Sequence, residues 1–227
     1  MRLYKLIHAD IRFQYKYGFY FLYTVFTLFY IFLIGVIPQE WKKTVSAVLI
    51  YSDPAAMGLF FMGAIVLLEK SQRVLDSIAV SPVSVREYIA AKVVSLCVIG
   101  VLVGTILAIS ANNQNIFLTI CGLTLSSVLF SLVGIIIAVK INSLNQFVVE
   151  TVPYLLILSV LPVVSLFFSF GRFMFLHPGA AALGLINGGQ ENPIIYILVL
   201  ILWNMGALVI CNRAVKKAFL ELGGVKL

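Results

Sequence analysis

The chain has 227 residues, of which 62% are hydrophobic and only 11% are charged, and it carries a formal net charge of +7. Soluble domains contain about 25% charged residues, so this composition excludes a soluble globular protein and indicates an integral membrane protein. At about 20 apolar residues per crossing, the length suffices for about six membrane helices and no separate soluble domain. We therefore expect one all-α membrane domain over residues 1–227.

Residues 1–16 are predicted to form an amphipathic helix that lies flat at the membrane surface. On a helical wheel of about 100° per residue, one narrow sector holds Arg2, Lys5, Arg12 and Lys16. Such a helix places its cations near anionic lipid headgroups. Asp10 and Gln14 fall on the apolar side and weaken the pattern, and a plain anchor is an equally good interpretation. We expect no cleaved signal, because the first apolar run ends at Pro38 without a small-residue cleavage site.

Six membrane spans are predicted from the apolar runs. They cover Gly18–Ile37, about Val45–Leu68, Val93–Ser110, Ile116–Val139, Phe147–Phe168 and Pro193–Cys211. The second span has the weakest pattern, because Ser52, Asp53 and Pro54 interrupt it. Ser52 or Asp53 is placed to cap a helix that begins at Pro54. An ionisable residue inside a membrane is also a functional candidate, so Asp53 has two interpretations.

The basic residues predict the orientation of the spans. Thirteen of the 16 lysines and arginines lie in the two terminal segments and in the connections after the second and fourth spans. Cytoplasmic segments carry an excess of Lys and Arg, so both termini and residues 69–92 are predicted to face the cytoplasm. Lys92 and Arg213 are expected to extend to the headgroup region. This distribution explains the net charge by membrane orientation and not by nucleic-acid binding.

Two spans contain candidates for a substrate pathway. The first span is rich in aromatic residues, and Phe26 and Tyr30 could line a cavity for flat apolar ligands, although packing against lipid or a partner subunit is the commoner role. In the fifth span, Glu150 lies about one turn from the start, near Tyr154. Glu150 could face a dimer interface, an inward-open cavity or headgroup water. Together with Asp53, these residues form the candidate set for the pathway.

Residues 170–192, between the fifth and sixth spans, are mostly apolar, but Pro178 and several glycines divide them into pieces too short to cross a membrane. Irregular backbone at membrane depth must be buried in protein or hydrogen-bonded internally. We therefore predict short external helices that dip into the outer leaflet before the sixth span. His177 has no second histidine or acid at metal-ligand spacing, so we interpret it as structural.

The polar segment 69–92 lies between the second and third spans. Residues 70–80 have an amphipathic pattern with two faces. The apolar face carries Val74, Leu75 and Ile78, and the polar face carries Lys70, Arg73 and Asp76. Such a helix fits a membrane surface or a groove in a protein partner, and an ordinary amphipathic loop is the alternative. Pro82 ends this helix, and Ser84 and Glu87 are spaced as a capping box for the next one.

The chain lacks the motifs of a membrane-embedded enzyme. It has no G-x-x-x-x-G-K-[ST] phosphate loop, so we predict that it cannot hydrolyse ATP by itself. It has neither a G-x-S-x-G nucleophile elbow nor an H-E-x-x-H zinc pair, and its two histidines are predicted to lie on opposite sides of the membrane. The three cysteines lie in apolar runs without CxxC spacing and are interpreted as packing residues. We expect a non-catalytic chain that binds no metal or cofactor.

Several short sequence motifs follow one another between Ser52 and Lys92. They are Ser52-Asp53-Pro54 with Gly58, the run Gly63–Lys70, Arg73-Val74-Leu75, Val80-Ser81-Pro82-Val83 and Tyr88–Lys92. Together they resemble the permease subunits of ABC-2 type ATP-binding-cassette exporters, especially the compact bacterial permeases of drug or fluoroquinolone export. The layout extends the resemblance to nearly the whole chain, with an interfacial helix, six spans and broken external helices before the last one.

The resemblance implies that residues 69–92 contain a coupling helix that docks on a separate ATPase subunit. The implied docking residues are Glu69, Lys70, Arg73, Val74, Leu75, Asp76 and Ile78. It further implies a second permease copy, identical or homologous, and two ATPase subunits that bind ATP and Mg²⁺. A hydrophobic or amphipathic substrate would be exported across a bacterial cell membrane. An ion-coupled carrier and a non-transporting assembly or immunity protein are the alternatives.

Overall fold

The structure is a computed structural model that describes residues 2–52, 57–113, 115–168, 171–188 and 192–222, and these residues contain helices and loops but no β-strand. The helices are α1 (Arg2–Lys16), α2 (Phe19–Val36), α3 (Gln39–Tyr51), α4 (Met57–Ser71), α5 (Val74–Ala79), α6 (Val85–Ser110), α7 (Ile116–Ala138), α8 (Leu144–Leu155), the π-helix η2 (Leu156–Val160), α9 (Leu161–Val164), the 3-10 helix η3 (Arg172–Leu176), α10 (Pro178–Ile186) and α11 (Pro193–Leu222). The predicted all-α fold class is confirmed.

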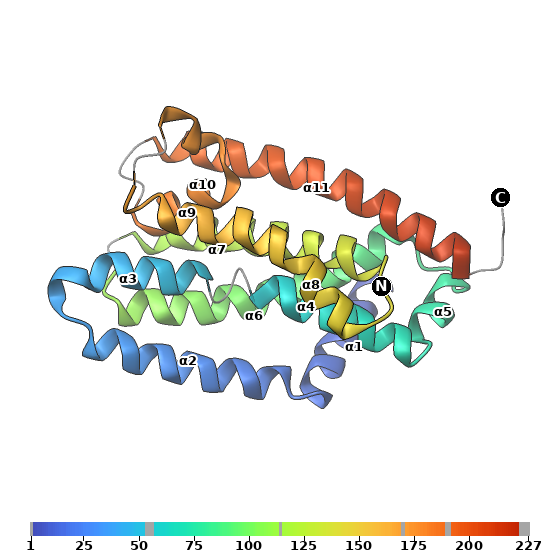
Figure 1. Cartoon of the computed structure of the whole chain (residues 1–227). Helices are drawn as coiled ribbons and strands as arrows, with labels where there is room; N and C mark the ends of the chain where they lie inside the picture. The colour runs from blue at the N-terminus through green and yellow to red at the C-terminus, as the bar shows by residue number, and fades with distance from the viewer. Residues whose placement is uncertain (1, 53–56, 114, 169–170, 189–191, 223–227) are drawn as a thin grey trace.

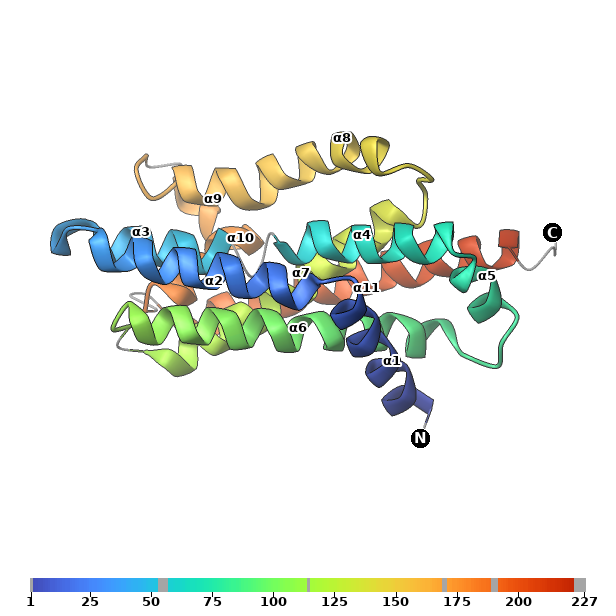
Figure 2. The same cartoon turned by 90° about the horizontal axis from the view of Figure 1, so that it is seen from below.

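Five helical segments within the described residues are long and apolar enough to cross a membrane. They are Phe19–Val36, Val85–Ser110, Ile116–Ala138, Leu144–Val164 and Pro193–Glu221. The described residues of the predicted second span belong to α3, with 13 residues, and α4, with 15, and neither helix is among these five segments. These two helices follow one another along the long axis of the molecule (Figures 1 and 2). Asp53 and Pro54, between them, lie outside the described residues.

The connections between the long helices gather at two ends of the molecule (Figures 1 and 2). One end holds α1, α5, the connection from α7 to α8 and the C-terminal end of α11, and we call it the basic end. The opposite end holds α10 and the connections from α2 to α3 and from α6 to α7. The charge-based topology requires this grouping of the connections. The assignment of the basic end to the cytoplasm rests on the charge count itself.

Helix α7 forms the centre of the bundle and packs against α4, α6, α10 and α11. In the membrane-length part of α7, 67% is buried inside the protein, whereas only 17% of the corresponding part of α11 is buried. Gly134 lets α7 approach the backbone of α4 closely, since a Cβ atom at this position would lie 2.7 Å from the carbonyl oxygen of Leu59. The core of the molecule is therefore built around α7, and α11 lies at the periphery.

At the opposite end, α3, η2 and α10 meet around one hydrogen bond. Pro162 has no N–H to donate to the carbonyl oxygen of Leu158, four residues earlier. The hydroxyl of Tyr51, at the end of α3, donates to that oxygen at 2.5 Å. Gly179 of α10 lies directly against this contact. Two short helices, η3 and α10, thus occupy the segment for which broken helices were predicted, and α10 is almost fully buried.

Candidate functional site

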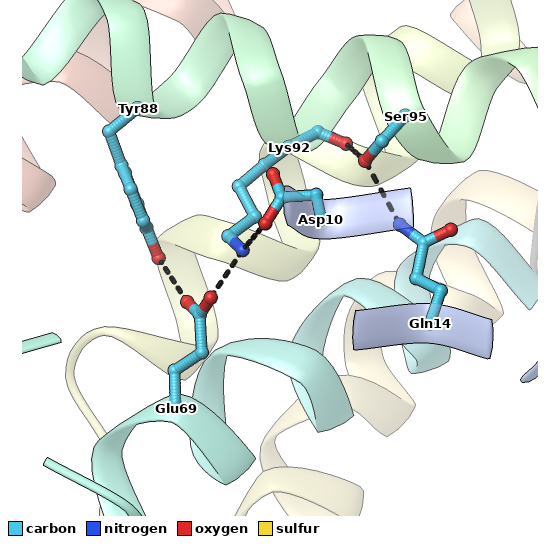
Figure 3. Close-up of polar contacts among 6 residues, drawn as sticks. All are labelled: Asp10, Gln14, Glu69, Tyr88, Lys92 and Ser95. Carbon is cyan, nitrogen blue, oxygen red and sulfur yellow. Dashed lines mark hydrogen bonds and ion pairs between the residues drawn. The ribbon is translucent and has the colours of Figure 1, made fainter. Parts of the chain in front are cut away.

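Three helices meet in a buried cluster of charged side chains near the basic end (Figure 3). Lys92 of α6 forms ion pairs with Asp10 of α1 and with Glu69 of α4, and its Nζ lies 2.5 Å from Glu69 Oε1. Tyr88, one turn before Lys92, donates its hydroxyl to Glu69 Oε2 at 3.1 Å. We call Asp10, Glu69, Tyr88 and Lys92 the ion cluster. It joins α1, α4 and α6 into one unit.

The ion cluster is almost closed to solvent, with Lys92 at 2% and Glu69 at 3% of full exposure. Burial raises the pKa of Asp10 and of Glu69 because a carboxylate loses its hydration there, and the positive charge of Lys92 only partly offsets this. One ammonium group faces two carboxylates, so full ionisation would leave a net negative charge in the interior. An uncompensated buried charge costs several kcal/mol. The geometry therefore favours retention of a proton on one of the two acids.

A second polar contact links α1 to α6 beside the ion cluster. Gln14 Nε2 donates to Ser95 Oγ at 2.9 Å (Figure 3). Asp10 and Gln14 are the residues that weakened the amphipathic pattern of α1, and they lie on that side because it packs against α6. Lys92 is buried, which corrects the expectation that it extends to the headgroups. The sequence did contain a signal for this contact. Asp10 and Gln14 are four residues apart and Lys92 and Ser95 are three apart, so each pair lies on one face of its helix.

Some residues of the predicted docking segment contact the chain's own helices and fix the segment to the bundle. Lys70 Nζ donates to the carbonyl oxygens of Val139 and Ile141, both at 2.7 Å, and so fixes the end of α4 to the connection after α7. Leu75 is fully buried, and Glu69 belongs to the ion cluster. We correct the prediction for Glu69 and Leu75, because side chains covered by helices of their own chain cannot contact an outside partner. Lys70 is half-buried, and its ammonium group is already bound.

The other part of the predicted segment remains accessible. Arg73 is exposed and adopts a left-handed backbone conformation, φ 56°, that separates α4 from α5. Val74, Asp76 and Ile78 are partly exposed. Val80, which follows α5, is 76% exposed and is the most open apolar side chain of this segment. These residues form one small surface of mixed charge and polarity at the basic end.

The predicted capping box at the start of α6 is confirmed. Ser84 Oγ accepts a hydrogen bond from the Glu87 amide at 3.2 Å, and Glu87 Oε2 accepts one from the Ser84 amide at 2.8 Å. These bonds satisfy two of the free N–H groups at the helix start. They fix where α6 begins, and hence where Tyr88 and Lys92 enter the ion cluster.

The pathway candidates lie in two separate parts of the structure. Phe26 and Tyr30 are stacked on α2, with ring centroids 6.3 Å apart. Glu150 and Tyr154 are exposed on α8. Because α2 packs against α1, α3 and α6, whereas α8 packs against α4 and α7, one chain does not assemble the four residues into a single site. Asp53 lies outside the described residues.

Comparison with known proteins gives one family and two relatives. The model of the Fluoroquinolones export permease protein family matches residues 1–210, which include every helix described above except the last part of α11. Two fluoroquinolones export permease proteins of Mycobacterium tuberculosis, from strains CDC 1551 / Oshkosh and ATCC 25618 / H37Rv, are each 28% identical over 129 residues. The aligned part covers 56% of this chain and 54% of each relative, so the match spans about half the length of these relatives.

Proposed function

Since the chain belongs to the fluoroquinolones export permease protein family, we propose that it is the membrane subunit of an ATP-driven exporter. Two copies of the chain, or one copy with a homologous permease, would form the pathway between them. Two separate ATPase subunits would bind ATP and Mg²⁺ and supply the energy. The observation that carries this proposal is the position of α5, a short, partly exposed helix at the basic end that packs against α4 and α11.

The proposed orientation places the basic end in the cytoplasm of a bacterial cell. Thirteen of the 16 basic residues lie in segments assigned to this end, and an excess of Lys and Arg marks cytoplasmic segments. The exposed basic side chains of α1 would then lie at the inner leaflet, where anionic lipids attract them. An ATPase in the cytoplasm would meet α5 first.

The proposed docking surface consists of the accessible part of the segment. Its members are Arg73, Val74, Asp76, Ile78 and Val80. A six-residue helix is too short to be stable alone, so its orientation depends on the buried side chains that hold it to the bundle. Val80 offers an apolar anchor, and Arg73 and Asp76 offer charges of opposite sign that would fix the orientation of a bound partner.

The contacts of α4 provide a route from this surface to the spans. Closure of the ATPase subunits would displace α5, which follows α4 directly. Glu69 would pass the displacement to α1 and α6 through the ion cluster, and Lys70 would pass it to the connection between α7 and α8. Both residues thus act as positioning residues behind the docking surface.

The proposed substrate is hydrophobic or amphipathic, in the manner of the fluoroquinolones for which the relatives are named. Aromatic rings such as those of Phe26 and Tyr30 can stack on a flat substrate. Glu150, Tyr154 and Asp53 stay candidates for polar contacts in a pathway that a second permease copy would complete.

Charge reversal at Arg73 tests the docking surface. The chain would be expressed and purified together with a candidate ATPase subunit, a chain that has a phosphate loop and no membrane span. Since disruption of one interfacial charge pair typically costs about 2 kcal/mol or more, R73E is expected to weaken ATPase binding about thirtyfold or more. K216E, which reverses an exposed charge on α11 at the same end, is the matched control and should retain the ATPase. An R73E chain that keeps both its ATPase and its export activity would contradict the proposal.

A proton-coupled carrier is the second candidate, because Asp10 and Glu69 are buried acids that share one lysine. Proteoliposomes with the chain alone would be supplied with a pH gradient. Accumulation of a fluoroquinolone without ATPase, abolished by E69Q, would establish the carrier and refute the ATP-driven exporter. We expect accumulation only when ATPase and ATP are both present.

A further inference from the structure

A lateral groove of about 650 Å³ lies between α6, α7 and α11. Its apolar lining includes Ile89, Val93, Leu125, Val128, Met205 and Leu208. Arg86 and Asn212 lie at the basic end of the groove, and Asn204 lies near the middle of the membrane-length part of α11. On α11 the lining runs from Ile201 to Asn212, which are 11 residues apart, so the groove is about 16 Å long.

The groove opens on the outer surface of the bundle. Val94 on α6 and Val209 on α11 are both exposed at its rim, and Met205 is 62% exposed. Helix α11 runs along one edge of the molecule (Figure 1) and is the least buried of the five candidate spans. In a membrane-spanning chain, the medium outside such a surface is lipid wherever no second copy covers it.

We propose that the groove binds one anionic phospholipid of the inner leaflet, with its phosphate at Arg86 and one acyl chain along the apolar wall. Basic pockets between membrane helices on the cytoplasmic side bind anionic headgroups. Arg86 is exposed and forms no ion pair within the described part of the chain. The neighbouring acid, Glu87, is held by Ser84 in the capping box. A phosphate would thus complement a cation that has no ion-pair partner among the described residues.

Asn204 is the polar side chain in the inner part of the groove. Its amide nitrogen donates to the carbonyl oxygens of Leu125, at 3.0 Å, and Leu200, at 2.8 Å, which anchors α11 on α7. Its amide oxygen is buried and has no hydrogen-bond partner among the described residues. That oxygen would favour a ligand with a donor group, such as a drug amine. Eleven of the 14 lining residues are apolar and the cation lies at the headgroup end, so the lining as a whole matches a lipid better.

Native mass spectrometry of the purified chain, titrated separately with phosphatidylglycerol, phosphatidylcholine and a fluoroquinolone, tests the proposal. Wild type is expected to retain one phosphatidylglycerol in preference to phosphatidylcholine. R86A should weaken phosphatidylglycerol binding about fivefold, since one basic residue near the surface contributes about 1 kcal/mol. A90F, which fills the groove, should abolish retention. K5A removes an exposed cation at the same end outside the groove and should change nothing.

The outcomes separate this site from general lipid contact. Equal retention by wild type and R86A, or an equal loss in K5A, would overturn the assignment of the phosphate to Arg86. Retention of a fluoroquinolone but no phosphatidylglycerol would overturn the lipid in favour of a donor-bearing ligand. Each variant is checked for its thermal midpoint, and if A90F does not fold, the comparison of R86A with K5A decides. The result is independent of ATPase docking, so it can fail while the exporter proposal stands.

Discussion

The two ends of the bundle are held together by different chemistry. At the basic end, α1, α4 and α6 are joined by the buried ion pairs of Lys92 with Asp10 and Glu69. At the opposite end, α3, η2 and α10 are joined by one hydroxyl and by close contact between backbones. Charges respond to a partner and to pH, whereas a close-packed junction responds only to shape. We expect the basic end to receive a signal and the opposite end to act as a fixed point.

Loss of the central cation should produce the largest effect. K92M removes the one positive charge of the ion cluster and leaves two buried carboxylates facing each other. Removing one partner of a buried ion pair costs about 3–5 kcal/mol, which thermal unfolding in detergent would measure. K217M, which breaks the exposed pair of Lys217 with Glu221, is the matched control and should change stability by less than about 0.5 kcal/mol. Equal effects of the two substitutions would mean that the ion cluster does not hold the basic end.

Crowding of the opposite end should produce the second largest loss of stability. In G179A the new Cβ would lie 2.3 Å from Leu158 O and 2.4 Å from Pro162 Cγ. Overpacking of this kind costs about 1–3 kcal/mol, and we expect a lower thermal midpoint. In α2, Gly35 has open space around its Cβ position, so G35A should be neutral or slightly stabilising. A G179A midpoint equal to that of G35A would show that the junction tolerates displacement.

The hydroxyl at the opposite end should contribute less. Y51F keeps the ring but removes the hydrogen bond to the Leu158 carbonyl, and a typical intramolecular hydrogen bond contributes about 0.5–1.5 kcal/mol. Y15F alters an exposed ring on α1 and serves as the control. The prediction fails if the two phenylalanine variants unfold at the same temperature.

The pH dependence should be the smallest effect. Burial raises the pKa of Asp10 and Glu69 above their ordinary values of 3.8 and 4.5. The folded state therefore binds more protons than the unfolded state in that range, and stability must fall as pH rises through the raised pKa values. Thermal midpoints measured from about pH 4 to pH 8 should decline for wild type and decline less for E69Q, which leaves one acid for one lysine. A midpoint that rises with pH would show that Lys92 fully compensates both acids.

Much of the fold could be predicted from local sequence. Runs of apolar residues located five of the spans, and the spacing of Ser84 and Glu87 located the start of α6. The second span was predicted with an interruption at Ser52, Asp53 and Pro54, and its described residues belong to the two helices α3 and α4. The ion cluster was missed because Asp10 and Lys92 are 82 residues apart in sequence. No local pattern can pair such residues.

Burial in the bundle could not be predicted from hydropathy. Helices α7 and α11 have nearly equal mean hydropathy, 2.4 and 2.6, but very different burial. Lipid and protein neighbours are equally apolar, so a lipid-facing helix resembles a core helix. The same limit applies to the docking segment, where Leu75 and Val80 are both apolar but only Val80 is exposed.

Lys70 restricts how the bundle can move. Its ammonium group binds the carbonyl oxygens of Val139 and Ile141, next to the C-terminal end of α7, where a cation is favoured by the helix dipole. If α4 slid along α7 by one turn, these contacts would break and Gly134 would no longer face Leu59. A change in the register of α4 against α7 is therefore disfavoured. We expect the two helices to tilt together as one rigid unit.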